Sequence, residues 1–366
     1  MDDSIEERKA DHIEICLEED VQARRATTGF EDVSLVHKAL PEIEREKIDL
    51  STTVFGYKFS APLFVGALTG GTAKALKINA AIAEAVEELN LGMGVGSQRV
   101  AIDNPKLERS FTVVREKAPT AFIVANIGGP QLVGKYGVKE AKRAVEMVEA
   151  NALAIHLNAL QEAVQPEGET NYSSLISKIG EVSQAVEVPV IVKETGAGIA
   201  AEEAKLLEEA GVAAIDVSGV GGTSWAAVEY YRAKKRQDGF SQRLGETFWD
   251  WGIPTAVSLV EAVKSVSLPV IASGGIRNGI DVTKVLALGA SLASATYPFL
   301  WPATKGPREV KKALQFLIGE VRNAMFLVGA DSLQKLQKVP VVLTGKTAEW
   351  LRVRGFQPEL YARRKA

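Results

Sequence analysis

The chain has 366 residues, 46% of them hydrophobic and 24% charged, an ordinary composition for a globular protein. Its formal net charge of −3 argues against a general nucleic-acid binder, which would carry a basic excess. Its only cysteine, Cys16, cannot form an intrachain disulfide, and its three histidines, with no HExxH or CxxC motif, disfavour a zinc site. No apolar run approaches the roughly 18 residues of a membrane span. The charged N-terminus lacks a signal-peptide core, so we expect a cytoplasmic protein with no membrane partner.

Eight short apolar runs recur along the chain, as expected of strands that are buried on both faces of a parallel sheet. They are Leu63–Ala67, Leu91–Val95, Phe122–Asn126, Leu153–Leu157, Val190–Lys193, Ala214–Ser218, Val270–Ser273 and Leu292–Ala295. Stretches with helical periodicity lie between them, at Ala75–Leu89, Val138–Ala150, Tyr172–Val186, Ala200–Ala210, Ala256–Val266 and Asp281–Leu288.

This alternation predicts an α/β protein with a closed (β/α)8 TIM barrel. An open doubly wound sheet is the alternative, but it predicts a GxGxxG motif after the first strand, where Ala67–Gly71 reads ALTGG. We predict one domain over residues 1–366, with an N-terminal extension (1–60), the barrel (61–304) and C-terminal helices (305–366). An aromatic and basic insertion (219–268) separates the sixth and seventh strands and is interpreted as a lid or a subunit contact.

Polar or glycine residues follow all eight predicted strands, where the active sites of barrel enzymes lie. The loops Ser218–Thr223 and Ser273–Arg277 are rich in glycine, so their backbone N–H groups can hold a phosphate. Lys193 ends the fifth strand and has three interpretations: a flavin partner, a Schiff-base nucleophile or a structural ion pair. Glu162 is either a cation ligand or a solvated loop residue. Arg8, Lys9 and His12 are either a phosphate clamp or a solvated helix face.

Several longer segments resemble the type 2 isopentenyl diphosphate isomerases, and the resemblance runs from Arg8 to about Gly355. The matching segments are RKADH, TGFEDVSLVHKALPEI, ALTGG, GVGSQR, ANIG, HLNALQEAVQPEG, VKETGAGI, DVSGVGGTSW, ASGGIRNGIDV and ALGAS. HLNALQEAVQPEG is the most specific of them, because generic flavin barrels share only the glycine loops. Leu68 is a departure, since many relatives have Met there, and an apolar residue of similar size should be tolerated.

The resemblance implies interconversion of isopentenyl diphosphate and dimethylallyl diphosphate in isoprenoid synthesis, by a 1,3-allylic proton shift without net redox change. It implies reduced FMN and Mg2+ as cofactors, NADPH or another reductant for the flavin, and a homo-oligomer, either tetramer or octamer.

The resemblance also implies a role for each matching position. Diphosphate contacts are expected at Arg8, Lys9, Ser97, Gln98 and Arg99, with His12, His156 and Asn158 nearby. FMN contacts are expected at Ala67, Leu68, Thr69, Ser97, Asn126, Lys193, Ser218 and Thr223, and phosphate-binding loops at Gly274, Gly275, Ile276, Arg277, Ala295 and Thr296. Gln161 matches the family's active-site glutamine, Glu162 the Mg2+ ligand and Glu229 an acidic position in the insertion.

Protonation of an alkene creates a tertiary cation, which an electron-rich reduced flavin can stabilise. Gln161 is a very weak acid and base, so we expect the flavin N5 atom to be the better proton donor. Glu229 is either a second proton shuttle or a salt-bridge partner of Arg232 or Lys235.

Three other functions compete with this interpretation. An FMN oxidoreductase on the same barrel would need a histidine base, for which His156 is the candidate. A Schiff-base lyase would use Lys193, and a non-catalytic flavin-binding protein would use the aromatic insertion as its contact surface.

Overall fold

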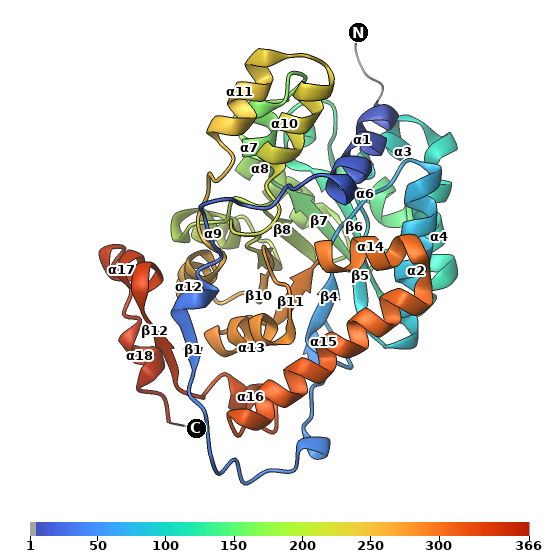
Figure 1. Ribbon diagram of the computed structural model, residues 1–366. Coiled ribbons are helices and arrows are strands. Elements are labelled where there is room, and N and C mark those ends of the chain that lie inside the picture. Colours follow the sequence, from blue (N-terminus) through green and yellow to red (C-terminus); the bar gives the residue numbers. More distant parts are fainter. Residues whose placement is uncertain (1–4, 366) are drawn as a thin grey trace.

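The computed structural model describes residues 5–365, and in it eight parallel strands close into a barrel surrounded by helices (Figure 1). The strands are β4 (Leu63–Val65), β5 (Gly92–Gly94), β6 (Phe122–Gly128), β7 (Ala152–His156), β8 (Val190–Lys193), β9 (Ala214–Asp216), β10 (Val270–Ala272) and β11 (Leu292–Ala295). They neighbour one another in chain order, and β11 pairs with β4 to close the ring, with Ala293 opposite Leu63. All eight predicted strands and the closed barrel are therefore confirmed, and the open sheet is excluded.

The six predicted helices are confirmed within a few residues at their ends. They are α2 (Ala73–Glu88), α6 (Val138–Met147), α8 (Leu175–Ala185), α9 (Ala201–Glu209), α12 (Thr255–Ser265) and α13 (Gly279–Leu288). The remaining helices of the barrel region are α3 (Arg99–Asp103), α4 (Arg109–Lys117), α5 (Gly129–Val133), α7 (Ala159–Val164) and α14 (Tyr297–Lys305).

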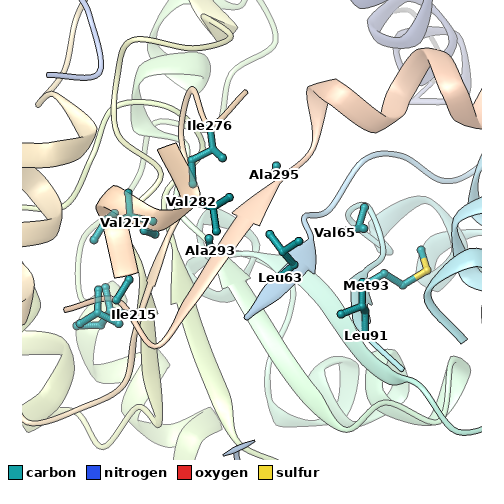
Figure 2. Packing of buried hydrophobic residues seen from close by; sticks show 14 of the residues in the cluster. Leu63, Val65, Leu91, Met93, Ile215, Val217, Ile276, Val282, Ala293 and Ala295 are labelled. Atoms are coloured by element: carbon teal, nitrogen blue, oxygen red, sulfur yellow. The ribbon is translucent and has the colours of Figure 1, made fainter. Parts of the chain in front are cut away.

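Alternating strand residues supply two apolar layers. In β6, Phe122 and Val124 face the inside of the barrel, whereas Ile123 and Ala125 pack outward against the helices. Figure 2 shows part of the outer layer, which includes Leu63 and Val65 of β4 and Met93 of β5. Because both faces of the sheet are buried, each strand reads as an almost continuous apolar run.

The N-terminal extension reaches both ends of the barrel. Helix α1 (Ile5–Glu18) lies near α10 at one end (Figure 1). The hairpin of β2 (Thr52–Val54) and β3 (Tyr57–Phe59) packs Val54 and Phe59 against the apolar barrel interior. The carboxyl ends of the strands are thereby left as the open mouth.

The C-terminal region differs from the prediction of helices alone. It contains α15 (Pro307–Leu327), α16 (Leu333–Leu336), α17 (Gly345–Val353) and α18 (Glu359–Ala362), but also β12 (Val341–Leu343). This strand pairs antiparallel with β1 (Val33–Leu35) of the N-terminal extension. The pairing is non-local, so no short-range pattern in either segment could show it.

The predicted insertion is shorter than expected. Within 219–268, α10 (Trp225–Lys235) and α11 (Gly239–Thr247) form a helical pair beside α1, whereas α12 is the ordinary barrel helix after β9. No helix in the part of the chain that the structure describes has the length and apolar character to cross a membrane.

Replacement of Phe59 by Ala should destabilise the fold, because this side chain has no exposed surface and packs against Phe122 with ring centroids 5.4 Å apart. Loss of a buried aromatic ring costs about 3–5 kcal/mol of unfolding free energy. Chemical denaturation measures the effect. Phe316→Ala is the matched control, since Phe316 is 70% exposed, and it should shift stability by less than about 0.5 kcal/mol. Equal effects of the two substitutions would contradict a stabilising role for the packing of the hairpin against the barrel interior.

Candidate active site

A cavity opens at the carboxyl ends of the strands, and residues that follow all eight strands line it together with side chains of α1. Most of the predicted site residues lie in this lining. They are Arg8, Lys9, His12, Ala67, Leu68, Thr69, Ser97, Arg99, Asn126, His156, Asn158, Gln161, Glu162, Lys193, Ser218, Thr223, Gly274, Gly275, Ile276, Arg277, Ala295 and Thr296. Gln98 and Glu229 are the two predicted residues outside it.

Gln98 is a correction to the sequence analysis. Its fully buried side chain donates from Nε2 to the Ala144 carbonyl (2.8 Å) and accepts at Oε1 from the Asn126 backbone N–H (2.8 Å). The amide therefore ties the end of β5 to β6 and α6 and does not face the cavity. In the string SQR, the turn into α3 directs the middle side chain inward while Ser97 and Arg99 line the cavity.

His156 is held as a neutral imidazole. Its Nδ1 lies 2.8 Å from Oδ1 of Asn126, whose Nδ2 donates to the Val95 carbonyl (3.0 Å). Because that Oδ1 only accepts, Nδ1 of His156 carries the proton. Burial, and then the charges of Lys193 and Lys9, lower the pKa of His156 to about 3.

Glu162 is fixed by three donors. Oε1 accepts from Nδ2 of Asn158 (2.8 Å), and Oε2 accepts from Nε2 of Gln165 (2.5 Å) and from the Glu169 backbone N–H (2.7 Å). Oε1 of Gln165 is buried, and no described residue forms a hydrogen bond with it. A carboxylate beside an unsatisfied amide oxygen suits a hard cation. Among the side chains that the structure describes, no group of three or more acidic, His or Cys residues is placed to hold a metal, so a cation here would take further ligands from phosphate and water.

Glu229 lies behind Gln161 in a buried network. Oε1 is 3.0 Å from Nε2 of His12 and accepts from Nε2 of Gln161 (2.9 Å), and Oε2 pairs with Arg232. Burial opposes ionisation, but the contact with His12, the charge of Arg232 and the hydrogen bond from Gln161 lower the pKa of Glu229 to about 2. The expected ion pair with Arg232 exists, whereas Lys235 pairs with Asp11 and Glu14. Glu229 is thus an ionised carboxylate one side chain away from the cavity.

Three cations of the lining gather near the end of β5. Nζ of Lys9 donates to the Ser97 carbonyl (3.1 Å), Arg99 pairs with Glu169, and Arg8 lies 3.8 Å from a carboxylate oxygen of Glu167. Burial, and then repulsion by Arg8 and Arg99, lower the pKa of Lys9 to about 7. An amine with so low a pKa beside two guanidinium groups suits an anionic ligand, which would favour its protonated form. In this structure Arg8 and Lys9 line the cavity of their own chain.

The glycine loops after β9 and β10 form a second cradle. Gly274 and Gly275 have φ of 98° and 71°, and a Cβ on Gly222 would lie 2.5 Å from the Gly275 backbone nitrogen. The two loops can pack this closely only as glycine. With the half-buried guanidinium of Arg277 in the same lining, the cradle has the shape and charge for a phosphate group.

Lys193 stands opposite Asp216 in the register of β8 and β9, and both side chains line the cavity. Nζ of Lys193 donates to the Glu194 carbonyl (2.6 Å), and no carboxylate of the described residues lies within 4 Å of it in an ion pair. The structural ion pair considered from the sequence is therefore not formed. Asp216 and Gln165 are not among the residues predicted from the sequence, although an acid inside the apolar run AIDVS is a usable signal for the first.

Comparisons with known proteins agree with this site. The family model for FMN-dependent dehydrogenases matches residues 1–102 and 139–342. The isopentenyl-diphosphate delta-isomerase of Methanosarcina acetivorans is 52% identical over 97% of this chain and 96% of its own length. That of Archaeoglobus fulgidus is 50% identical over 96% and 100%. The chain belongs to the isopentenyl-diphosphate delta-isomerase family. The resemblance seen in the sequence is thereby confirmed, and the protein is an enzyme.

Solved structures of flavin enzymes share the fold of this family member. A mandelate oxidase aligns with a TM-score of 0.60 at 20% identity over 92% of this chain and 97% of its own. A flavocytochrome b2 variant aligns with a TM-score of 0.65 at 17% identity over 93% and 84%. At these identities the likeness concerns the barrel alone.

The lowered pKa of Lys9 predicts pH-dependent binding of pyrophosphate. An anion favours the ammonium form, so binding should take up a proton at pH 7.5–8.5, and affinity should fall as the pH rises above about 7. One linked proton limits this fall to about tenfold per pH unit. Calorimetry in buffers of different ionisation enthalpy measures the uptake.

Lys9→Met should bind pyrophosphate more weakly and lose this component of the pH dependence. The ligand's own titration is common to both proteins, so their difference isolates Lys9. Lys106→Met, at an exposed position, is the control and should behave as the wild type. An unchanged proton uptake in Lys9→Met would refute the assignment.

Proposed function

We propose that this enzyme interconverts isopentenyl diphosphate and dimethylallyl diphosphate by a 1,3-allylic proton shift, with reduced FMN and Mg2+, in isoprenoid biosynthesis. The observation that carries the proposal is a single cavity with two separate anion sites. The cations Arg8, Lys9 and Arg99 gather near β5, and the glycine cradle with Arg277 follows β10. In the barrel, β11 and β4 separate these two strands. Two phosphate-bearing ligands in one mouth suit a phosphorylated cofactor beside a diphosphate substrate.

The cradle side of the cavity is assigned to FMN. When bound and reduced, FMN would supply a flat, electron-rich surface and a proton at N5. Its phosphate is assigned to Gly274, Gly275, Ile276, Arg277, Ala295 and Thr296. Its ring and ribityl chain are assigned to Ala67, Leu68, Thr69, Ser97, Asn126, Lys193, Ser218 and Thr223. The family model that matches this chain carries the description FMN-dependent dehydrogenase, which supports this cofactor. NADPH is proposed as the reductant of the flavin.

The cation side is assigned to the substrate diphosphate. Its contacts are assigned to Arg8, Lys9, His12, Ser97, Arg99, His156 and Asn158, and Mg2+ to Glu162. The unsatisfied amide oxygen of Gln165 supports a cation beside Glu162. The alkene has few groups that the protein can contact, so contacts to the diphosphate supply most of the binding energy. This binding energy can be used to position the alkene for reaction.

Gln161 and Glu229 are the residues of this chain assigned to the proton shift. Gln161 donates to Glu229 (2.9 Å) and accepts from Nδ2 of Asn158 (3.1 Å), so its amide is held in one orientation. A carboxamide neither gains nor loses a proton readily, so Gln161 orients the reacting group. Glu229 is the carboxylate next to it and is assigned as a second proton shuttle, through His12 or a water molecule.

A flavin oxidoreductase is the second candidate, since the matched family model and the solved structures belong to dehydrogenases and oxidases. Such chemistry needs a histidine base. The pKa of His156 is lowered to about 3 and its Nδ1 proton is engaged by Asn126, which makes His156 a weak base. We further propose a cytoplasmic homo-oligomer, tetramer or octamer.

The proposed activity is tested anaerobically. The purified protein receives FMN, Mg2+, dithionite or NADPH, and isopentenyl diphosphate in D2O, and NMR follows dimethylallyl diphosphate. We expect product only with reduced flavin, with deuterium incorporated and without stoichiometric consumption of reductant. Tight FMN binding without product, or net oxidation of a substrate, would point to the oxidoreductase.

Gln161→Ala should lower kcat about 100-fold, because an oriented hydrogen-bonding group at the reacting centre contributes roughly that factor. Glu229→Gln should also lower kcat while FMN affinity, followed by flavin fluorescence, stays unchanged. Gln334→Ala, at an exposed position in α16, is the control. Near-wild-type turnover of Gln161→Ala would remove Gln161 from the catalytic residues, and an unchanged rate of Glu229→Gln would leave Glu229 a structural ion-pair partner.

A further inference from the structure

The segment that follows α1 lies across the glycine cradle. The Ala23 backbone N–H donates to the Gly222 carbonyl (2.8 Å), and Gln22 forms an antiparallel bridge with Thr223. Farther along the segment, a Cβ on Gly275 would lie 2.3 Å from Cγ2 of Thr28. A stretch outside the barrel is therefore part of the wall of the phosphate cradle.

Gln22 of this segment holds the guanidinium of Arg277. Nη2 of Arg277 donates to Oε1 of Gln22 at 2.6 Å. The other hydrogen bond of the guanidinium, from Nη1, goes to the carbonyl of the preceding residue, Ile276, at 3.1 Å. One face of the group lies over the ring of Tyr297, 5.0 Å from its centroid. Among the described residues, Gln22 is thus the side chain that fixes the direction of Arg277 by a hydrogen bond.

The orientation of the Gln22 amide follows from chemistry. A guanidinium only donates hydrogen bonds, so the amide oxygen must face Arg277. This leaves Nε2 pointing elsewhere, and it is buried without a hydrogen-bond partner among residues 5–365. An unsatisfied buried donor lowers the stability of the folded protein. The fold therefore tolerates an amide whose own donor is unpaired while its oxygen orients Arg277.

In the part of the chain that the structure describes, no carboxylate forms an ion pair with the guanidinium of Arg277, whose hydrogen bonds go to Gln22 and Ile276. The Asp281 carboxylate accepts from the backbone N–H of Arg277 (3.0 Å) and not from its side chain. Burial lowers the pKa of Arg277, so the folded protein holds this cation at a cost that a bound anion would offset. Orientation matters here because a guanidinium binds phosphate best through two parallel N–H groups.

We infer that Gln22 is a positioning residue for the cofactor phosphate: through Arg277 it sets the preference of the site for FMN over riboflavin, which lacks the phosphate. The inference rests on the proposed use of FMN. It concerns the phosphate alone, so the flavin ring should be bound equally well with or without Gln22.

The test compares binding of oxidised FMN and riboflavin by flavin fluorescence. In Gln22→Met, which keeps the size of the side chain but cannot accept from Arg277, the Kd for FMN should rise about tenfold. The Kd for riboflavin should stay within twofold of the wild type. The Tm of the flavin-free protein should stay close to that of the wild type, because the substitution removes an unsatisfied donor and the acceptor of Arg277 together. Gln357→Met, at an exposed position, is the matched control and should change neither Kd.

A double-mutant cycle identifies the route of the effect. If Gln22 acts through Arg277, Gln22→Met should have no further effect on FMN affinity in an Arg277→Met background. Additive losses in the double variant, or equal weakening of FMN and riboflavin, would overturn the inference.

Failure of the inference and failure of the proposed function are distinguishable. If the wild-type protein binds neither flavin, the proposal that FMN is its cofactor is wrong. If the protein binds flavin and Gln22→Met leaves the preference for FMN over riboflavin unchanged, only the role of Gln22 is refuted.

Discussion

Closure of the barrel between β11 and β4 is the constraint on which the rest of the structure depends. Eight parallel strands in a ring bring eight carboxyl ends to one rim, so residues far apart in the chain line one cavity. The hairpin of β2 and β3 fills the opposite end with Phe59 and Val54. The polar chemistry is thereby confined to the mouth, and stability is supplied by the apolar layers inside and outside the sheet.

The mouth is built as a set of incompletely satisfied charges. Lys9 lies among cations. Within the described part of the chain, no carboxylate pairs with the guanidinium of Arg277, and the amide oxygen of Gln165 beside Glu162 has no hydrogen-bond partner. Each of these arrangements lowers the stability of the ligand-free protein. The two cationic groups suit an anion, and the amide oxygen beside the carboxylate suits a cation. In contrast, both carboxylate oxygens of Glu229 have partners, namely His12 and Gln161 on Oε1 and Arg232 on Oε2, so this buried carboxylate is stabilised within the protein itself.

The N-terminal extension reaches both proposed anion sites. Its helix α1 carries Arg8 and Lys9 to the cation cluster, and the segment after it carries Gln22 to Arg277. In a barrel enzyme, an extension of this kind allows side chains from outside the repeating βα units to line the mouth. It also explains why glycine is required where the extension crosses the loops, since a Cβ at Gly221 would lie 2.1 Å from the Thr28 backbone nitrogen.

The sequence by itself determined the barrel and most of its mouth, because buried parallel strands are short apolar runs and the residues after them must converge. It also determined the family, through a long specific string around Gln161 and Glu162. Only the tertiary structure decided contacts that depend on orientation and long-range pairing. In the folded chain the Gln98 side chain points into the protein interior and β1 pairs with β12. Gln22 contacts Arg277 although more than two hundred residues separate them in the sequence. The position of a residue along the chain predicts that it follows a given strand and lies near the mouth of the barrel. The conformation of each loop decides whether its side chain faces the cavity.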